Sequence, residues 1–483
     1  MIFSKNKFSN LILPLLFFLL NLILKIIFLD NRDIAMDEPF SIFYAQKNLG
    51  GIIEMLKTEN NPAFHFFFLH YWIKLFGISA FSVRFPSLLF SSLTSVVILK
   101  IGEKFFNLKT GITAALIFTF STMHIFFSHE ARVYSLFSLL TALSLFFFLE
   151  IAKNPKAKNN YFFLFFSNLL LIYSHYFGFF VIAIQLFSLL FIYRNFGALK
   201  KMLIILVTLL ICYIPNTIVF INRFLVTTRN GTWVAPPKLT QGYGFLNLFI
   251  NNRYNMLVLI LILLVSGIIL MRQKKISEKI KLFSENISFK IILTWFLVPY
   301  FTMFLISFKF PVFIDRYILY TSIPFYLLIA SLINYLFEKE NYKNIAIVFF
   351  TGSLIFTVEL NPDNYRRSKE VADKIKKMKN ENTIVFIAPD FADLGFAYYY
   401  NIVYFKDYTN TRRFLNKENI YPIGTKDDAE HILENRNDDV IYLQAGSEFN
   451  DPKNLIYNYF TKKYKHSEKF LVYQIYIITH FYN

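Results

Sequence analysis

The chain has 483 residues, of which 55% are hydrophobic and 19% aromatic. A soluble protein of this size does not need so many apolar residues, and several apolar runs approach the ~20 residues that cross a bilayer. The formal net charge is +18, but the basic residues recur in short clusters and form no single patch, which disfavours nucleic-acid binding. The only cysteine, Cys212, lies inside an apolar run, which excludes disulfides and cysteine-based metal sites.

The apolar runs predict an α-helical polytopic membrane protein with about eleven spans. The expected spans are residues 8–29, 82–100, 110–128, 132–151, 161–175, 176–193, 201–221, 254–271, 289–307, 316–337 and 342–360. Lys5 and Lys7 precede the first span, as in a secretory signal. That span is too long for a signal core and no small-residue cleavage site follows, so we expect it to remain uncleaved.

Basic clusters alternate with the spans. With the N-terminus inside, the clusters at residues 100–109, 153–158, 194–201, 272–281 and 339–343 fall in cytoplasmic loops, as the positive-inside rule expects. The opposite loops then hold Asp37-Glu38, His129–Arg132, His175-Tyr176, Trp233 and Asp315–Tyr317. This sorting predicts an extracytoplasmic site on the cytoplasmic membrane. Cytoplasmic nucleotide sugars and ATP do not reach that face, so an activated donor would arrive through the lipid.

Two adjacent acids, Asp37 and Glu38, follow the first span. Carboxylates beside lipid are costly to keep, so the pair is a functional hypothesis. It suggests a general base that faces a lipid-borne substrate. The alternative is that two acids in a loop simply stay solvated.

The first outer loop, residues 30–81, contains two amphipathic stretches. Gly51–Thr58 and Ala63–Phe76 are expected to lie along the membrane interface, where aromatic residues usually anchor a helix. Asn61 and His65 either line a substrate site or belong to this anchor. We take residues 1–360 as one membrane domain that includes the loop.

Charged and polar residues dominate after residue 360, and we expect residues 361–483 to form a small extracytoplasmic α/β domain. The predicted helices are Ser368–Lys379, Asp427–Asn435 and Pro452–Tyr464, and the predicted strands are Thr383–Ala388, Asp439–Gln444 and Phe470–Thr479. The domain has no glycine-rich phosphate loop, so docking or acceptor selection is favoured over nucleotide binding.

The polar motifs occur in a specific order. Asp37-Glu38 is followed by Asn61-Pro62, then by Ser82–Ser87 at span two, His129–Tyr134 at span four, and Arg316-Tyr317 at a late span that also holds Pro324. In this order they resemble the GT-C-fold integral membrane glycosyltransferases, in particular the bacterial protein-mannosyltransferase, aminoarabinose-transferase and Rgt-like class. The resemblance covers about residues 1–360.

This resemblance implies inverting transfer of one sugar from a polyprenyl-phosphate donor to an envelope glycolipid, glycan or protein. Asp37 matches the catalytic base, and Glu38 would orient it, raise its pKa or bind a metal. The family is not uniform in metal use, so no cofactor is assigned and a divalent metal is left open. Phe40 stands where some relatives place a basic side chain, which leaves the donor details undecided.

The remaining site residues follow from the same resemblance. Arg132, Arg84 and Arg316 each begin a span on the outer face and would bind the donor phosphate. For Arg84 and Arg316 the alternative is snorkelling or an ion pair with Glu130 or Asp315. The expected substrate-binding residues are Glu130, His129, His175, Tyr176, Asn61 and His65. For His175 the alternative is a histidine whose hydrogen bonds are satisfied between helices.

Two other functions are compatible with a polytopic chain. A transporter or flippase of lipid-linked glycans would need charged residues within the membrane depth, and the spans contain few. A non-catalytic scaffold that presents the C-terminal domain is the weaker alternative. The sequence does not name the sugar, the acceptor or the oligomeric state.

Overall fold

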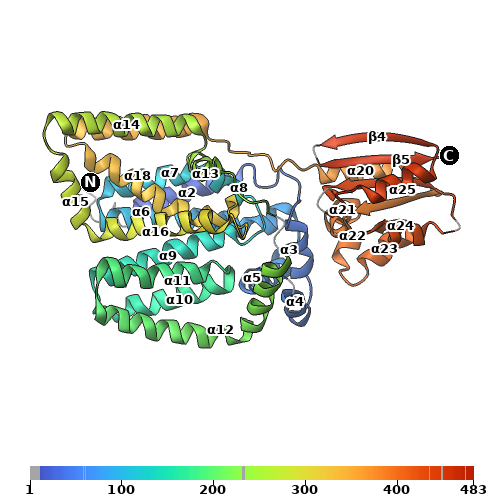
Figure 1. Cartoon of the computed structure of the whole chain (residues 1–483), viewed down its shortest axis with the longest axis horizontal. Helices are drawn as coiled ribbons and strands as arrows, with labels where there is room; N and C mark the ends of the chain where they lie inside the picture. The colour runs from blue at the N-terminus through green and yellow to red at the C-terminus, as the bar shows by residue number, and fades with distance from the viewer. Residues whose placement is uncertain are drawn as a thin grey trace. The chain divides into compact units, whose positions relative to one another are not determined.

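The computed structural model describes residues 11–57, 59, 61–230, 234–434, 436–447, 450–473 and 475–483 (Figure 1). Trp233, Asn435 and the start of the first apolar run, with Lys5 and Lys7, lie outside these ranges. The chain forms two compact units. The first comprises Met1–Leu29, Glu54–His65 and Arg84–Pro362, and the second comprises Asp30–Ile53, Phe66–Val83 and Asp363–Asn483.

Helices make up the first unit. They are α2 (Leu13–Ile26), α6 (Ala80–Phe105), α7 (Leu108–Thr119), α8 (Thr122–Ser128), α9 (Tyr134–Lys153), α10 (Lys158–Ser174), α11 (Gly178–Phe187) with the π-helical turn η2 (Ser188–Tyr193), α12 (Phe196–Asn230), α13 (Gln241–Phe249), α14 (Arg253–Arg272), α15 (Ile276–Glu285), α16 (Ile287–Ile306), α17 (Asp315–Ile318), η3 (Leu319–Thr321), α18 (Ser322–Leu336) and α19 (Glu340–Thr357). Helix occurs at every predicted span. The chain is therefore a polytopic helical membrane protein.

The number of crossings is less sharply defined than the number of helices. Within the described residues, six helices are long and apolar enough to cross a membrane, or seven if α7 and α8, bent by 62°, form one broken span. α2 and α11–η2 are shorter apolar helices. The eleven crossings remain a prediction. Short or broken helices packed among longer ones can also lie within the membrane, so length and hydropathy alone do not count the crossings.

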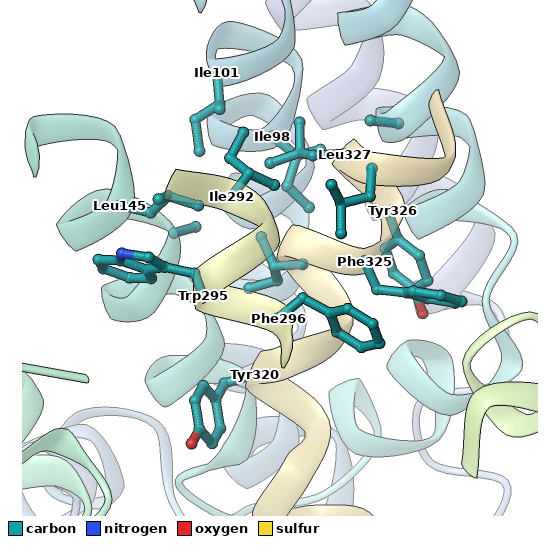
Figure 2. Packing of buried hydrophobic residues seen from close by; sticks show 14 of the residues in the cluster. Ile98, Ile101, Leu145, Ile292, Trp295, Phe296, Tyr320, Phe325, Tyr326 and Leu327 are labelled. Carbon is teal, nitrogen blue, oxygen red and sulfur yellow. The ribbon is translucent and has the colours of Figure 1, made fainter. Parts of the chain in front are cut away.

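The core of the first unit lies between α6, α9, α16 and α18. Figure 2 shows Ile98, Leu145, Trp295 and Leu327 of these helices, which belong to one cluster of buried side chains. Outer helices such as α12 and α14 instead expose large apolar side chains, for example Ile218 and Leu264. Apolar residues both inside and outside the bundle are typical of helices surrounded by lipid.

Ion pairs and one backbone contact join the predicted cytoplasmic loops to one another. The contacts are Lys275–Glu338 at 2.7 Å, Lys104–Glu150 at 2.8 Å, Lys109–Glu340, and the Lys201 ammonium on the carbonyl oxygen of Pro155 at 2.9 Å. The basic loops therefore share one end of the bundle, as the alternation predicted. Which side of a membrane that end faces stays a prediction.

The α/β domain in the second unit is built on a five-stranded sheet of order β2-β1-β3-β5-β4 (Figure 1). β1 (Thr383–Ala388), β2 (Ile420–Pro422) and β3 (Asp439–Ala445) are parallel, and β4 (His466–Tyr473) and β5 (Tyr476–Tyr482) add an antiparallel hairpin. The helices are α20 (Ser368–Met378), η4 (Asp390–Ala392), α21 (Asp393–Tyr400), α22 (Ile402–Lys406), α23 (Thr411–Lys417), α24 (Lys426–Ile432) and α25 (Leu455–Lys463). All six residues of β1 are buried, which is typical of a central parallel strand.

These elements confirm the predicted α/β class and most of its parts. The single strand predicted over Phe470–Thr479 is wrong, because the chain reverses before Tyr476 and the segment belongs to two strands. β2, which is only three residues long, was not predicted.

The first outer loop contributes α3 (Glu38–Ala45), α4 (Leu49–Leu56) and α5 (Phe64–Phe76). The last two match the predicted amphipathic helices, whereas α3 was not predicted. Pro39 lies in the first turn of α3, where its missing N–H and fixed φ are well tolerated. The ring of His70 binds the carbonyl of Ala45 through Nδ1 at 2.8 Å, which ties α5 to the end of α3.

Candidate active site

The segment His129–Val133 interrupts the helices of the first unit. α8 ends at Ser128 and α9 begins at Tyr134, and His129 and Ala131 between them are fully buried. Buried non-helical backbone must find hydrogen-bond partners within the protein. Here His129 Nε2 lies 2.7 Å from the carbonyl oxygen of Lys25, His65 Nε2 lies 3.3 Å from that of Ala131, and Ser87 Oγ donates to that of Arg132 at 3.3 Å. Residues of α2, α5 and α6 therefore fix the segment that carries Arg132.

His175 lies between α10 and α11, close to aromatic rings. Its ring centroid is 5.0 Å from that of Phe137 and 5.5 Å from that of Tyr317. Its Nδ1 accepts the backbone N–H of Phe177 at 3.2 Å. Burial, followed by the charges of Arg132 and Arg316, lowers the pKa of His175 to about 3. The imidazole is therefore neutral at pH 7 and carries its proton on Nε2, where it can donate.

His65 shares this environment. Burial lowers its pKa to about 3, and the charge of Arg132 acts in the same direction. Arg132 thus influences both histidines, and Arg316 influences one of them. We call Arg132, Arg316, His65 and His175 the arginine–histidine cluster. Two guanidinium groups near neutral imidazoles suit an anion with several oxygens, because arginine contacts phosphate or carboxylate in a bidentate manner.

Arg316 is presented by the short helix α17. Its backbone N–H donates to Asp315 Oδ1 at 2.7 Å, and its guanidinium carbon lies 5.7 Å from the ring centroid of Tyr317. Tyr317 also contacts the ring of His175, which links α17 to the cluster.

Arg84 has a different environment. It is fully buried in α6, and its guanidinium donates to the carbonyl oxygen of Leu29 at 3.1 Å. This contact ties α6 to the end of the first apolar run. The phosphate-binding role of Arg84, and the alternative of snorkelling or an ion pair, both stay predictions.

Tyr176 and Asn61 share an acidic neighbour, Glu59. Burial and the charge of Glu59 raise the pKa of Tyr176 to about 12, against the opposing effect of Arg223. Asn61 Nδ2 donates to Glu59 Oε1 at 3.0 Å. Sequence reasoning singled out Tyr176 and Asn61 but missed Glu59 and Arg223. The position of Glu59, an acid two residues before the Asn61-Pro62 motif, could have indicated it.

Asp37 and Glu38 lie in the second unit, at the start of α3. The backbone carbonyl of Asp37 accepts the N–H of Ser41 at 3.2 Å, so Asp37 is the N-terminal cap residue of the helix. The positive end of the helix dipole favours a carboxylate at this position. Glu38 is only 3% exposed, whereas Asp37 is half-buried. Of the two acids, Asp37 is the more exposed.

No group of three or more His, Cys, Asp or Glu side chains able to hold a metal occurs in the described part of the chain.

Glu130, another acid expected at the site, is 8% exposed and lies in the buried segment two residues before Arg132.

Comparison with known proteins identifies the architecture. Residues 60–219 match the family model of the dolichyl-phosphate-mannose-protein mannosyltransferases, which is about a third of the chain. The apo crystal structure of ArnT from Cupriavidus metallidurans superposes with a TM-score of 0.58 at 12% identity, covering 96% of this chain and 97% of ArnT. The chain has the GT-C fold. This confirms the fold expected from the order of the sequence motifs.

Two further structures share this GT-C architecture. ArnT bound to undecaprenyl phosphate superposes with a TM-score of 0.55 at 11% identity over 96% of this chain and 97% of ArnT. The oligosaccharyltransferase AglB from Archaeoglobus fulgidus, in complex with an inhibitory peptide and a dolichol-phosphate, superposes with a TM-score of 0.51 at 10% identity, covering 98% of this chain and 75% of AglB. No curated protein sequence matches the chain significantly.

Proposed function

We propose that the protein is an inverting glycosyltransferase. It would move one sugar from a polyprenyl-phosphate donor to an envelope glycolipid, glycan or protein on the outer face of the cytoplasmic membrane. The observation that carries this proposal is the arginine–histidine cluster, which supplies two guanidinium groups inside a GT-C fold. The ArnT and AglB structures that contain undecaprenyl phosphate and dolichol-phosphate support the class of donor.

In this proposal Arg132 and Arg316 bind the phosphate of the donor. The phosphate oxygens gain negative charge as the bond to the sugar breaks, and fixed cations stabilise that charge more in the transition state than in the bound donor. His175 contributes a neutral Nε2–H donor, because its low pKa keeps it uncharged at pH 7.

Asp37 serves as the general base. An acceptor hydroxyl attacks the anomeric carbon from the face opposite the phosphate, so that a carbon–oxygen bond to the acceptor forms while the bond to the phosphate oxygen breaks. The acceptor proton passes to the Asp37 carboxylate. The phosphate leaves as an anion and needs no proton, so one carboxylate suffices, whereas glycoside hydrolases need two.

The test combines one product analysis with one matched pair of variants. Mass spectrometry of envelope glycolipids and glycoproteins, with and without the chain, should reveal one missing monosaccharide. Asp37→Asn should lower transfer about 100-fold or more, the scale of general-base catalysis. Asp30→Asn is the control, since Asp30 is an exposed acid in the same loop.

Near-normal transfer by Asp37→Asn would show that the base is assigned wrongly. Reconstituted liposomes distinguish the transport alternative. If lipid-linked sugar crossed the bilayer and no new glycosidic bond formed, the protein would be a flippase and the proposal would fail.

A further inference from the structure

The segment that precedes Asp37 is fixed to the C-terminal α/β domain within the second unit. The backbone N–H of Ile34 donates to the hydroxyl oxygen of Tyr399 in α21 at 2.6 Å. Asp33 is bound at two points, because the N–H of Lys369 donates to its carboxylate at 2.9 Å and Asn364 Nδ2 donates to its carbonyl at 3.0 Å. Three hydrogen bonds from the α/β domain therefore fix the two residues Asp33 and Ile34.

The segment that follows Asp37 packs against the same domain. A Cβ atom added to Gly395 of α21 would lie 3.6 Å from Pro39 Cγ, so the Pro39 ring faces the backbone of α21 at Gly395. The rings of Phe43 and Phe405 meet edge to face with centroids 5.5 Å apart. Pro39 and Phe43 are buried. The α/β domain thus contacts α3 on the far side of Asp37 in the sequence.

Between these anchors the backbone takes an unfavourable conformation. Met36, directly before Asp37, has a φ of 55°, in the left-handed region that residues with a Cβ rarely adopt. Such a conformation persists when the surrounding contacts over-determine it. Here those contacts are the hydrogen bonds to Asp33 and Ile34 and the packing on Pro39 and Phe43. Because Met36 sets the chain direction into Asp37, these contacts also set the position of the carboxylate.

Helix α21 holds a second part of the unit as well. The hydroxyl of Tyr398 donates to the carbonyl oxygen of Ile78, in the connection between α5 and α6, at 2.8 Å. Neighbouring tyrosines on one helix therefore bind both the Asp37 segment and the end of the interfacial helix. A loop with polar functional residues is usually among the more mobile parts of a protein, and this one is hydrogen-bonded to α21.

We propose that the α/β domain positions Asp37, with Tyr399 of α21 as the positioning residue. This inference rests on the proposed role of Asp37 as the general base. It gives the C-terminal domain a part in the chemistry that does not depend on the acceptor: the domain holds Asp33 and Ile34 before the base and Pro39 and Phe43 after it.

The first test compares Tyr399→Phe with Tyr464→Phe in the full-length protein in nanodiscs. Both substitutions remove one hydroxyl that bonds a backbone group, but Tyr464 donates to the carbonyl of Asp438 at 2.8 Å, outside the Asp37 segment. Tyr399→Phe should lower transfer about 10- to 100-fold, the usual effect of a small misplacement of a catalytic group. Its affinity for undecaprenyl phosphate, measured by native mass spectrometry, should stay within twofold of the wild type. Tyr464→Phe should change neither quantity.

Hydrogen exchange gives a readout that does not depend on activity. Peptides covering residues 33–45 should exchange faster in Tyr399→Phe than in the wild type, while peptides of β1 and β3 stay unchanged. In the Asp37→Asn background, Tyr399→Phe should lower transfer no further, because its effect passes through Asp37.

Gly395 offers a second variant pair without a change in hydrogen bonding. Gly395→Ala places its Cβ at ordinary contact distance from Pro39 and should retain activity. Gly395→Leu pushes a larger side chain against Pro39 and should reproduce the loss of transfer seen in Tyr399→Phe, again with unchanged undecaprenyl-phosphate affinity.

The outcomes separate the two proposals. If Asp37→Asn is inactive but Tyr399→Phe and Gly395→Leu keep wild-type transfer and exchange, the positioning role is wrong and the proposed function stands. If Asp37→Asn itself keeps transfer, the base assignment fails and the positioning proposal falls with it. If Tyr464→Phe loses transfer as strongly as Tyr399→Phe, the effect is general stability of the domain and positioning is rejected.

Discussion

His129 and Lys25 join the candidate site to the first membrane helix: the imidazole Nε2 lies 2.7 Å from the lysine carbonyl oxygen. The Lys25 side chain points elsewhere, and its ammonium donates to Ser91 Oγ of α6 at 2.8 Å. Both Lys25 and His129 are fully buried. The end of α2 is therefore held by α6 and by the segment that carries Arg132. Loss of either contact should change the position of that segment.

His129→Leu tests this connection. The substitution removes the donor to a buried carbonyl, which should lower the free energy of unfolding by about 1–3 kcal/mol. Because His129 lies in the same non-helical segment as Arg132, affinity for undecaprenyl phosphate should fall as well. Thermal unfolding and native mass spectrometry in nanodiscs measure the two effects. His431→Leu, at an exposed histidine of α24, is the control. A His129→Leu protein with wild-type melting temperature would contradict the expectation.

The buried histidines predict how stability depends on pH. The pKa values of His65 and His175 are about 3 in the folded chain, below the ordinary value of about 6.5 in the unfolded chain. Below pH 6.5 the unfolded chain therefore binds more protons than the folded chain. Stability from the neutral histidines is complete above pH 6.5 and decreases toward pH 3, by up to about 1.4 kcal/mol per pH unit for each histidine.

His175→Asn should flatten this dependence. Denaturant unfolding at pH 7 and pH 5 should show a smaller difference in unfolding free energy for the variant than for the wild type, whatever its stability at pH 7. Arg132→Gln should leave this difference nearly unchanged, because burial is the larger cause of the low pKa and keeps both histidines neutral in the folded chain at pH 5. Equal slopes in His175→Asn and the wild type would show that His175 is not buried and neutral.

The arginines should separate into two kinds by their effects. Arg132→Gln should weaken undecaprenyl-phosphate binding about 10-fold or more, the scale expected for a charge-assisted hydrogen bond. Arg84→Gln should mainly lower stability, since the fully buried Arg84 guanidinium donates to the Leu29 carbonyl. Binding titrations and thermal unfolding of both variants make the comparison. If Arg84→Gln lost affinity at full stability, the phosphate role predicted from the sequence would be right.

Local patterns in the sequence predicted the helices and part of the site. Hydropathy located helix at each expected span, and the motif order indicated the GT-C fold. The motif order also identified Arg132, His175 and Arg316 as candidate site residues. In the structure the charges of both arginines act on His175. α3 was missed because it is only eight residues long and starts with Glu-Pro. The hydrogen bonds that anchor the Asp37 segment could not be predicted from local patterns, because Ile34 and Tyr399 are 365 positions apart in the sequence.

A closed polar triangle inside the bundle should contribute to stability. Ser144 Oγ donates to Asn168 Oδ1 at 2.7 Å, Asn168 Nδ2 donates to Gln185 Oε1 at 2.9 Å, and Gln185 Nε2 donates to Ser144 Oγ at 2.6 Å. The three residues come from α9, α10 and α11 and are fully buried. Hydrogen bonds between membrane helices are worth about 0.6–2 kcal/mol each. Asn168→Leu breaks two of them, together with a 3.1 Å bond from Gln185 Nε2 to Asn168 Oδ1, and should destabilise the protein by about 1–3 kcal/mol.

The triple variant Ser144→Ala, Asn168→Leu, Gln185→Leu is compared with Asn168→Leu to separate hydrogen bonding from packing. It leaves no partner of the triangle unsatisfied, so it should be more stable than Asn168→Leu alone. Thermal unfolding of the two variants and the wild type gives the comparison. If the triple variant were the least stable of the three, packing and not hydrogen bonding would be the main contribution of these side chains.

Close approach of α6 and α7 makes two glycines intolerant of substitution. A Cβ on Gly102 would lie 2.4 Å from the Cα of Gly111, and a Cβ on Gly111 would lie 2.4 Å from the carbonyl oxygen of Leu99. Both clashes involve backbone, so relief requires the helices to separate. Gly102→Ala should therefore lower the free energy of unfolding by about 1–3 kcal/mol, the usual cost of overpacking.

Gly352→Ala provides the opposite expectation in the same protein. Gly352 lies in α19, and a Cβ there would meet nothing within 4 Å. Because alanine favours a helix over glycine by about 0.5–1 kcal/mol, this variant should be neutral or slightly more stable. The yield of folded protein after extraction and its melting temperature measure both variants. If Gly102→Ala behaved like Gly352→Ala, the two helices would have room to separate, and the contact between the glycines would not fix how α6 packs on α7.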